Sequence, residues 1–146
     1  MKIEIEVIGI VKNSENEPRG QNWKDIASEI RIFEKFKKAV EGLEEFSHIQ
    51  VLFWLHRAKR DRKMIHPKNR KELPLVGVFA TRTQHRPNPI GVTVAELLEI
   101  KDNVLIVRGL DALNKTPVLD VKAFVGVDIQ NYKVPEWVLR LRNEKR

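Results

Sequence analysis

The sequence predicts a mostly β protein, an antiparallel β-barrel of about six or seven strands with one short helix and loop insertions. Short segments that are β-branched, aromatic or alternating in polarity recur along the chain, as strands do. Helices do not alternate regularly with them, as a parallel α/β sheet would require. The 146 residues, 42% of them hydrophobic, suffice for one core. No repeat or linker divides them, so we expect a single domain over residues 1–146.

The first half of the chain is expected to contain three strands and the helix. Residues 3–11 alternate apolar residues with glutamates, which predicts a strand, and a polar loop follows. Residues 30–32 alternate again, although the wider apolar spacing around them also permits a helix. Apolar residues recur at helical spacing over 34–45, which predicts a short helix. Residues 49–55 are rich in β-branched and aromatic residues and are typical of a buried strand.

The second half contains the clearest local signal, a β-hairpin. Two apolar runs, 90–100 and 104–110, are separated by Lys101-Asp102-Asn103. Asp and Asn tolerate the left-handed conformations that a tight turn needs, so these runs are expected to pair. The other predicted elements are strands at 75–80 and 118–124 and a terminal helix at 134–141.

Positive charge is concentrated in one segment of the chain. The formal net charge is +7, and residues 57–72 hold eight basic and two acidic residues. Such a segment attracts polyanions, nucleic acid above all, although a solvated surface loop has the same composition. With a nucleic-acid partner, the residues expected to contact its phosphates, RNA phosphates included, are Lys59, Arg60, Arg62, Lys63, Lys68, Arg70, Lys71 and, outside the segment, Arg86.

Several classes of protein are excluded by the sequence. It contains no Cys, which rules out disulfides, thiolate metal sites and thiol nucleophiles. The four His are scattered, so no metal site is expected. Apolar runs are too short for a transmembrane helix, and the charged, alternating N-terminus is not typical of a secretion signal. We therefore expect a cytoplasmic protein without a membrane partner.

The densest set of polar groups lies in the segment from Phe79 to Gly91. Pro87 and Pro89 fix their own φ angles and push the preceding residues into extended conformations, so this segment is stiff before any ligand binds. Arg82 and Arg86 each offer a planar fork of donors to a carboxylate or phosphate. The alternative interpretation is a strand connection whose arginines form surface ion pairs.

Two strings in this order and spacing carry a family resemblance. They are Arg86-Pro87-Asn88-Pro89-Ile90-Gly91 and Thr116-Pro117-Val118-Leu119-Asp120, within a similarity that runs from about Ile8 to Tyr132. The chain resembles the TsaA/TrmO-like (YaeB, UPF0066-type) family of S-adenosyl-L-methionine-binding β-barrel proteins. Characterised members of that family methylate N6-threonylcarbamoyladenosine at position 37 of the tRNA anticodon loop. In agreement, the chain has no Gly-rich dinucleotide-binding turn.

The resemblance implies an S-adenosyl-L-methionine-dependent tRNA methyltransferase that works as a homodimer. The tRNA anticodon loop would be its partner. Carried over residue by residue, the cofactor contacts fall at strand ends and loops, where a barrel can gather them at one mouth. These residues are Pro18, Arg19, Gly20, His56, Arg57, Arg82, Val92, Asn114, Lys115, Thr116 and Pro117.

Three departures from the family pattern concern the site. The family turn Asp-Gly-Thr-Pro is here Asn114-Lys115-Thr116-Pro117, which removes a carboxylate and places a side chain where Gly is usual. Pro-Arg-Gln is here Pro18-Arg19-Gly20-Gln21, and Lys-Pro-Tyr is here Lys122-Ala123-Phe124, which removes a phenol. These departures bear on the identity of the substrate more than on the class of cofactor.

Transfer of a methyl group to N6 requires alignment of donor and acceptor and removal of a proton from the nitrogen. His85 is the first candidate for base or substrate orienter, with Asp120 as a second catalytic candidate and His56 as a further available base. Each has a structural alternative: a hydrogen-bonding role for the histidines, and an ion pair with Lys122 or Arg82 for Asp120. Two other functions remain open, a cofactor-binding barrel with a small-molecule or protein acceptor and a non-catalytic RNA-binding barrel.

Overall fold

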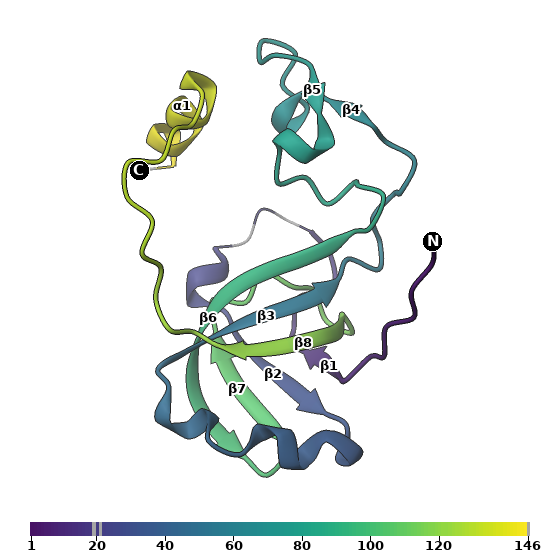
Figure 1. Cartoon of the computed structure of the whole chain (residues 1–146), viewed down its shortest axis with the longest axis vertical. Coiled ribbons are helices and arrows are strands. Elements are labelled where there is room, and N and C mark those ends of the chain that lie inside the picture. Colours follow the sequence, from purple (N-terminus) through teal and green to yellow (C-terminus); the bar gives the residue numbers. More distant parts are fainter. Residues whose placement is uncertain (19, 21, 146) are drawn as a thin grey trace.

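A closed, six-stranded antiparallel barrel forms the body of the protein. The computed structural model describes residues 1–18, 20 and 22–145. The strands follow one another around the barrel in the order β1-β2-β7-β6-β3-β8, and every neighbouring pair is antiparallel (Figure 1). Their bounds are Gly9–Lys12 (β1), Ala27–Ile32 (β2), His48–Trp54 (β3), Ile90–Lys101 (β6), Val104–Arg108 (β7) and Pro117–Ala123 (β8). The predicted fold class is confirmed.

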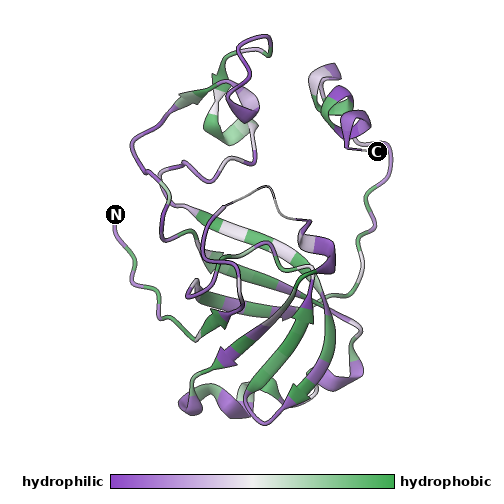
Figure 2. Cartoon of the chain, turned by 180° about the vertical axis from the view of Figure 1, so that it is seen from behind, coloured by the Kyte–Doolittle hydropathy of each residue, from purple (hydrophilic) through white to green (hydrophobic). Residues whose placement is uncertain are grey.

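Alternate residues of these strands fill the barrel. Ile30, Ile49, Val51, Leu105 and Val107 are completely buried and belong to one hydrophobic cluster. Each buried aliphatic side chain of this kind stabilises the fold by about 1.5–3 kcal/mol. Figure 2 shows hydrophobic residues along the barrel strands and hydrophilic ones where the chain leaves the barrel. The barrel core therefore follows from the period of two in the sequence.

The predicted hairpin is present as β6 and β7. Lys101 pairs with Val104, so two residues form the turn. Asp102 has a φ of 57°, in the left-handed region that Asp tolerates better than most residues. The strand predicted at 49–55, the one at 118–124 and the terminal helix are also present, the last as α1 (Glu136–Glu144).

The N-terminal alternation does not form the predicted strand. Only Gly9–Lys12 is paired, whereas residues 1–8 lie outside the sheet and expose Ile3 and Ile5. β2 ends at Ile32, opposite Gly9, and β8 pairs with β1 only at Pro117 and Val118. Because no strand of the barrel continues beside residues 1–7, their alternation has nothing to pair with. Residues 30–32, which were compatible with strand or helix, belong to β2.

The predicted helix at 34–45 is two 3-10 helices, η2 (Glu34–Val40) and η3 (Leu43–Glu45). Gly42, with a φ of 94°, lies between them and breaks the helical path. Residues 75–80 are also only partly strand, because β5 (Val76–Gly77) is followed by η5 (Val78–Ala80). The remaining elements are η1 (Trp23–Asp25), β4 (Met64–Ile65) and η4 (Pro67–Asn69).

Residues 55–89, here called the excursion, connect β3 to β6 and carry the small β4-β5 sheet. The excursion stands over one end of the barrel, with α1 beside it (Figure 1). Arg70 of the excursion pairs with Glu144 of α1, and Leu73 and Pro74 line a small recess with Trp137. No described helix is both long enough and apolar enough to cross a bilayer.

Candidate functional site

One end of the barrel, here called the mouth, gathers most of the predicted site residues. β3 ends where β6 begins, with Trp54 opposite Ile90, and β8 begins beside β1, with Pro117 opposite Ile10. The antiparallel register therefore brings three loops to this end: 13–22 after β1, the excursion after β3, and 109–116 before β8. Residues far apart in the sequence meet there because the barrel closes.

A hydrogen-bond network joins the first and third of these loops. Asn13 Nδ2 donates to the Ser28 hydroxyl and to the Ala112 carbonyl, both at 2.9 Å, and the Asn114 backbone N–H donates to the Glu15 carbonyl. Asn114 Nδ2 donates to Asn16 Oδ1 at 3.0 Å. Asn13 is not among the residues predicted from the sequence. The signal that could have identified it is an Asn directly after a predicted strand, where Asn side chains hydrogen-bond to backbone groups.

Arg57 ties the excursion to the same network. Its guanidinium donates to the Asn16 carbonyl at 2.9 Å and to the Glu17 carboxylate at 3.0 Å. Pro18 and Gly20 follow in the same loop and are exposed, with Gly20 at a φ of 66°. Arg19 lies outside the described residues.

The 114–117 turn is strained at one residue. Lys115 has a φ of 69°, a conformation that glycine adopts without cost and lysine does not. This geometry explains why a Gly at this position suits the turn. Thr116 next to it is buried, with 2% of its surface exposed, whereas Lys115 is exposed.

Residues 81–89, here called the proline loop, are held partly by hydrogen bonds among themselves. Arg86 donates from Nη1 to the carbonyls of Thr81 and Thr83, at 3.4 and 3.0 Å. The Thr81 hydroxyl accepts from the Thr83 backbone N–H. Arg86 therefore stabilises its own loop. Arg82 is exposed and makes no hydrogen bond or ion pair within the described part of the chain, which leaves its guanidinium available to a ligand.

The two histidines near the mouth differ in what their rings do. His85 Nδ1 accepts a hydrogen bond from the Lys59 backbone N–H at 3.0 Å, so in the neutral ring the proton is on Nε2. Burial, Arg62 and Lys59 lower the pKa of His85. Burial and Arg57 lower the pKa of His56, which also hydrogen-bonds to the Trp54 backbone. Both rings are therefore neutral at neutral pH.

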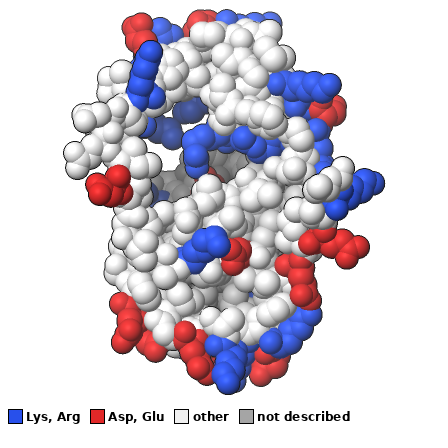
Figure 3. Space-filling view, viewed as in Figure 1, with Lys and Arg blue, Asp and Glu red and all other residues white. Residues whose placement is uncertain are grey.

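The basic residues of the excursion fall into two groups. Arg57, Arg60 and Arg70 are engaged with other residues of the chain. The side chains of the others are exposed and, among the described residues, have no hydrogen bond or ion pair: Lys59, Arg62, Lys63, Lys68 and Lys71. Figure 3 shows a hollow between the excursion and the barrel with Lys and Arg side chains at its margin.

Two predicted site residues lie away from the interior of the mouth. Val92 is on β6, where its neighbours in the strand face the core, and it is 39% exposed on the outer surface of the barrel. Asp120 forms an ion pair with Lys122 at 2.8 Å and accepts from the Val121 backbone N–H. Asp120 therefore forms the ion pair with Lys122 that was the alternative to a catalytic role.

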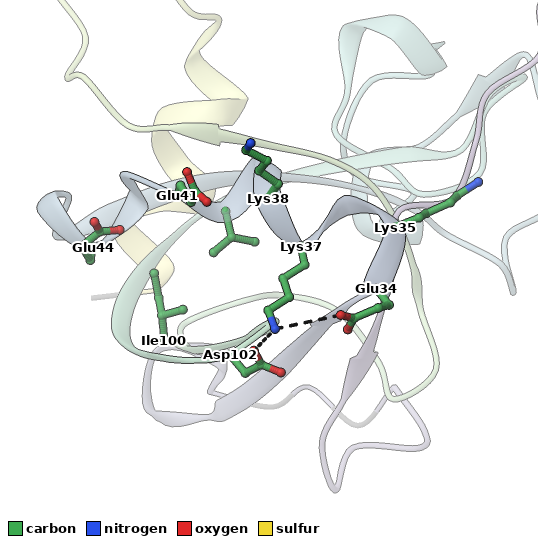
Figure 4. A pocket seen from close by; sticks show the side chains of 9 residues that line it. Glu34, Lys35, Lys37, Lys38, Glu41, Glu44, Ile100 and Asp102 are labelled. Atoms are coloured by element: carbon green, nitrogen blue, oxygen red, sulfur yellow. Dashed lines mark ion pairs between the residues drawn. The ribbon is translucent and has the colours of Figure 1, made fainter.

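A surface cavity of about 630 Å³ lies at a different place on the barrel. It is formed by η2, η3 and the β6-β7 turn, and its charged residues include Lys37, which is paired with both Asp102 and Glu34 (Figure 4). None of the predicted site residues lines it. The described residues also contain no group of three or more metal-ligating side chains.

The groups at the mouth fit a zwitterionic sulfonium ligand. Arg82 offers a fork of donors to a carboxylate. Glu17, held by Arg57, supplies negative charge near a cationic group. The carbonyls of Pro87 and Pro89 accept hydrogen bonds from Arg60 Nε and from the Leu55 N–H, so they hold the proline loop in place. A ligand that carries both charges has complementary partners here.

Comparison with known proteins gives consistent matches. Residues 9–128 match the family described as tRNA-methyltransferase O N-terminal domain. A probable S-adenosyl-L-methionine-binding protein of Methanothermobacter thermautotrophicus is 43% identical over 128 residues, covering 85% of this chain and 91% of that protein. The human tRNA (adenine(37)-N6)-methyltransferase is 37% identical over 98 residues, 66% of this chain and 22% of the human protein.

Solved structures have the same fold. A crystal structure of TrmO from P. aeruginosa superposes with a TM-score of 0.76 at 29% identity, covering 94% of this chain, and a second TrmO structure does so with 0.71 at 32%. The chain spans 62% and 64% of the length of these two proteins. On its sequence and its fold, the chain belongs to the tRNA-methyltransferase O N-terminal-domain family.

Proposed function

We propose that this protein is an S-adenosyl-L-methionine-dependent tRNA methyltransferase that methylates N6 of threonylcarbamoyladenosine at position 37 in the anticodon loop. The observation that carries the proposal is the meeting of the proline loop, the 114–117 turn and the end of β3 at one mouth of the barrel, beneath a basic excursion. Relatives named as S-adenosyl-L-methionine-binding proteins and a human relative named as an adenine(37)-N6-methyltransferase support it.

In this reaction the main task of the protein is to align the methyl donor with the acceptor nitrogen. When bound, S-adenosyl-L-methionine supplies an electrophilic methyl group on a sulfonium, whose bond to sulfur breaks as the bond to N6 forms. The residues of the mouth orient the two reactants, with Arg82 as the partner of the donor's carboxylate. Orientation of this kind accounts for a large part of the rate in a displacement reaction.

The N6 proton must leave, and the two histidines are suited to different tasks. His85 Nδ1 accepts from the Lys59 N–H, and Nε2 lies 3.4 Å from the Gln84 side-chain amide, so both ring nitrogens have neighbours that fix the ring and suit it to orienting the substrate. His56 bonds to the Trp54 backbone and is neutral, so its second ring nitrogen offers a lone pair. We therefore assign substrate orientation to His85 and proton acceptance to His56.

The exposed lysines and Arg62 of the excursion supply the RNA contact. Lys and Arg side chains lie at the margin of the hollow between the excursion and the barrel (Figure 3), where phosphates on either side of a single-stranded base would meet positive charge. A base in an anticodon loop is already exposed, so the protein does not have to recognise base edges within the groove of a duplex.

The test is methyl transfer to defined RNA. The purified protein is incubated with labelled S-adenosyl-L-methionine and tRNA that carries threonylcarbamoyladenosine, and nucleosides are analysed by mass spectrometry. We expect label on that nucleoside and none on tRNA lacking the threonylcarbamoyl group. Arg82→Ala should abolish donor binding, whereas the control Arg31→Ala, a β2 arginine paired with Glu29, should not.

Other outcomes of the same experiment identify the alternative functions. Donor binding without transfer to any tRNA would reject the proposal and favour a small-molecule or protein acceptor. RNA binding without a calorimetric signal for the donor would indicate a non-catalytic RNA-binding barrel. RNA affinity that hardly changes with salt would contradict the phosphate contacts.

We also propose that the protein acts as a homodimer. Residues 124–132 lie outside the sheet and expose Val125, Val127 and Ile129 to 85%, 72% and 68%. Exposed apolar side chains in such a row are typical of a protein interface. Light scattering of the purified protein should give twice the chain mass, and Val127→Lys should shift it to the monomer. A monomeric wild type would refute the proposal.

A further inference from the structure

We infer that Arg60 is a positioning residue, which holds the proline loop in the geometry that binds the methyl donor. This inference rests on the proposed function, since it concerns the same site. From the sequence alone, Arg60 is expected to contact RNA phosphates. Its contacts in the structure are instead with the proline loop and the end of β3.

The proline loop needs donors from elsewhere. Pro87 and Pro89 have no backbone N–H, so this stretch cannot be held by an ordinary strand ladder. Its acceptors remain: the carbonyls of both prolines, the Asn88 side-chain oxygen and Nδ1 of His85. A loop with these properties is ordered only if a neighbouring segment presents donors at matching positions.

Residues 55–60 present those donors. The Leu55 backbone N–H donates to the Pro89 carbonyl at 2.8 Å, and the Lys59 backbone N–H donates to His85 Nδ1 at 3.0 Å. Arg60 Nε donates to the Pro87 carbonyl at 2.7 Å. The donors at 55, 59 and 60 thus meet acceptors at 89, 85 and 87.

Arginine is the side chain that suits this position. Its Nε bonds to Pro87 while Nη2 bonds to Asn88 Oδ1 at 3.3 Å, which uses the planar fork for two adjacent residues. Cζ of the same guanidinium lies over the Trp54 ring, 5.3 Å from its centroid. Lysine has the charge but neither the fork nor the flat face. The shape of the Arg60 guanidinium, and not its charge alone, therefore holds the proline loop.

The side-chain contacts of Arg60 differ from those of Lys63, which lies three residues further on in the same basic segment. Lys63 is exposed, and its side chain forms no hydrogen bond or ion pair with any described residue. Replacing Lys63 removes a phosphate contact without touching the proline loop. Lys63→Ala is therefore the matched control for Arg60→Ala.

The experiment measures donor and RNA binding separately. Titration calorimetry with S-adenosyl-L-methionine should show roughly tenfold or greater loss of affinity in both Arg60→Ala and Arg60→Lys, and no change in Lys63→Ala. The slope of log affinity for tRNA against log salt should fall by about 0.7 in Lys63→Ala and remain unchanged in Arg60→Ala. With saturating tRNA, the Arg60 variants should raise KM for the donor more than they lower kcat.

Two results would overturn the inference. One is a reduced salt slope in Arg60→Ala with intact donor affinity, which would make Arg60 a phosphate contact. The other is full donor affinity in Arg60→Lys, which would make charge sufficient. Asn88→Ala removes one of the three contacts and should lose donor affinity to a smaller extent, which separates positioning from global misfolding.

Failure of the proposed function is distinguishable from failure of this inference. If the wild type binds no S-adenosyl-L-methionine, the proposed function is wrong. Hydrogen exchange still tests whether Arg60 holds the proline loop in place. Arg60→Ala should accelerate exchange of the Lys59 and Leu55 amides, which donate to the proline loop, relative to amides of the barrel strands. Unchanged protection of these amides would refute the inference that Arg60 holds the proline loop in place.

Discussion

The backbone N–H of Lys59 donates to Nδ1 of His85 across 3.0 Å, and so joins the basic excursion to the proline loop. A protonated ring would carry a hydrogen on Nδ1 and would repel this N–H. The contact and the nearby cationic side chains of Arg62 and Lys59 therefore favour the neutral ring.

We expect the protein to lose stability as the pH falls below the ordinary histidine value of 6.5. The pKa of His85 is lower in the folded chain than in the unfolded one, so its contribution is fully present above pH 6.5 and is lost as the pH falls toward the folded pKa. Urea unfolding from about pH 8 to about pH 5 measures this. His85→Gln should have a shallower pH dependence, with His56 accounting for part of the remainder. An unchanged dependence in His85→Gln would contradict the assignment.

Lys115→Gly should stabilise the protein. The lysine adopts a φ of 69°, which costs an L-residue about 1 kcal/mol and glycine nothing. The free energy of unfolding should therefore rise by about 1 kcal/mol in urea titrations. Lys122→Gly is the control, because Lys122 lies within β8, where glycine weakens a strand. A loss of stability in Lys115→Gly would show that the lysine side chain contributes more than the strain costs.

Two glycines of the barrel should not tolerate alanine. A Cβ at Gly91 would lie 2.4 Å from the Phe53 ring, and one at Gly9 would lie 2.6 Å from the Arg31 backbone carbonyl. Each variant should lose about 1–3 kcal/mol in the free energy of unfolding. Phe53→Leu should partly rescue Gly91→Ala, since a side chain causes that clash. Gly77→Ala is the control, because its nearest contact would be 3.9 Å away.

For Gly9→Ala no side-chain replacement should restore stability. The clash is with backbone in the β1-β2 ladder, where Gly9 pairs with Ile32. Rescue of Gly9→Ala by a substitution at position 31 would contradict this account. Wild-type stability of Gly91→Ala would mean that the Phe53 ring moves without cost.

Arg70→Ala should loosen α1. Arg70 hydrogen-bonds to the carboxylates of Glu144 in α1 and Glu72 in the excursion, and these bonds lower the pKa of both carboxyl groups. Without Arg70, hydrogen exchange of the α1 amides should become faster, while barrel amides remain protected. Lys71→Ala, which removes an exposed charge without a described partner, should leave α1 unchanged. Equal protection of α1 in both variants would show that the helix is held by other contacts, such as Trp137.

Local residue pattern was sufficient for most of the barrel. The hairpin of β6 and β7 has a two-residue turn at Asp102, and β3 and β8 contain residues whose types favour strands. Pattern was not sufficient at residues 3–7, which alternate as a strand does but lie beside no other strand. It was also insufficient at 34–45, where Gly42 divides the predicted helix. Pairing depends on neighbours, and a single segment contains no information about them.

The sequence by itself determined the family, the barrel and the stiffness of the proline loop, because these depend on strings of adjacent residues. Only the tertiary structure decided which basic residues are engaged. Arg60 and Lys63 are equivalent in composition, yet Arg60 bonds to Pro87 across the fold and Lys63 is exposed. The antiparallel pairing of β3 with β6, which ends at Trp54 opposite Ile90, brings residues 55–60 against 85–89, and this juxtaposition assigns each side chain its partner.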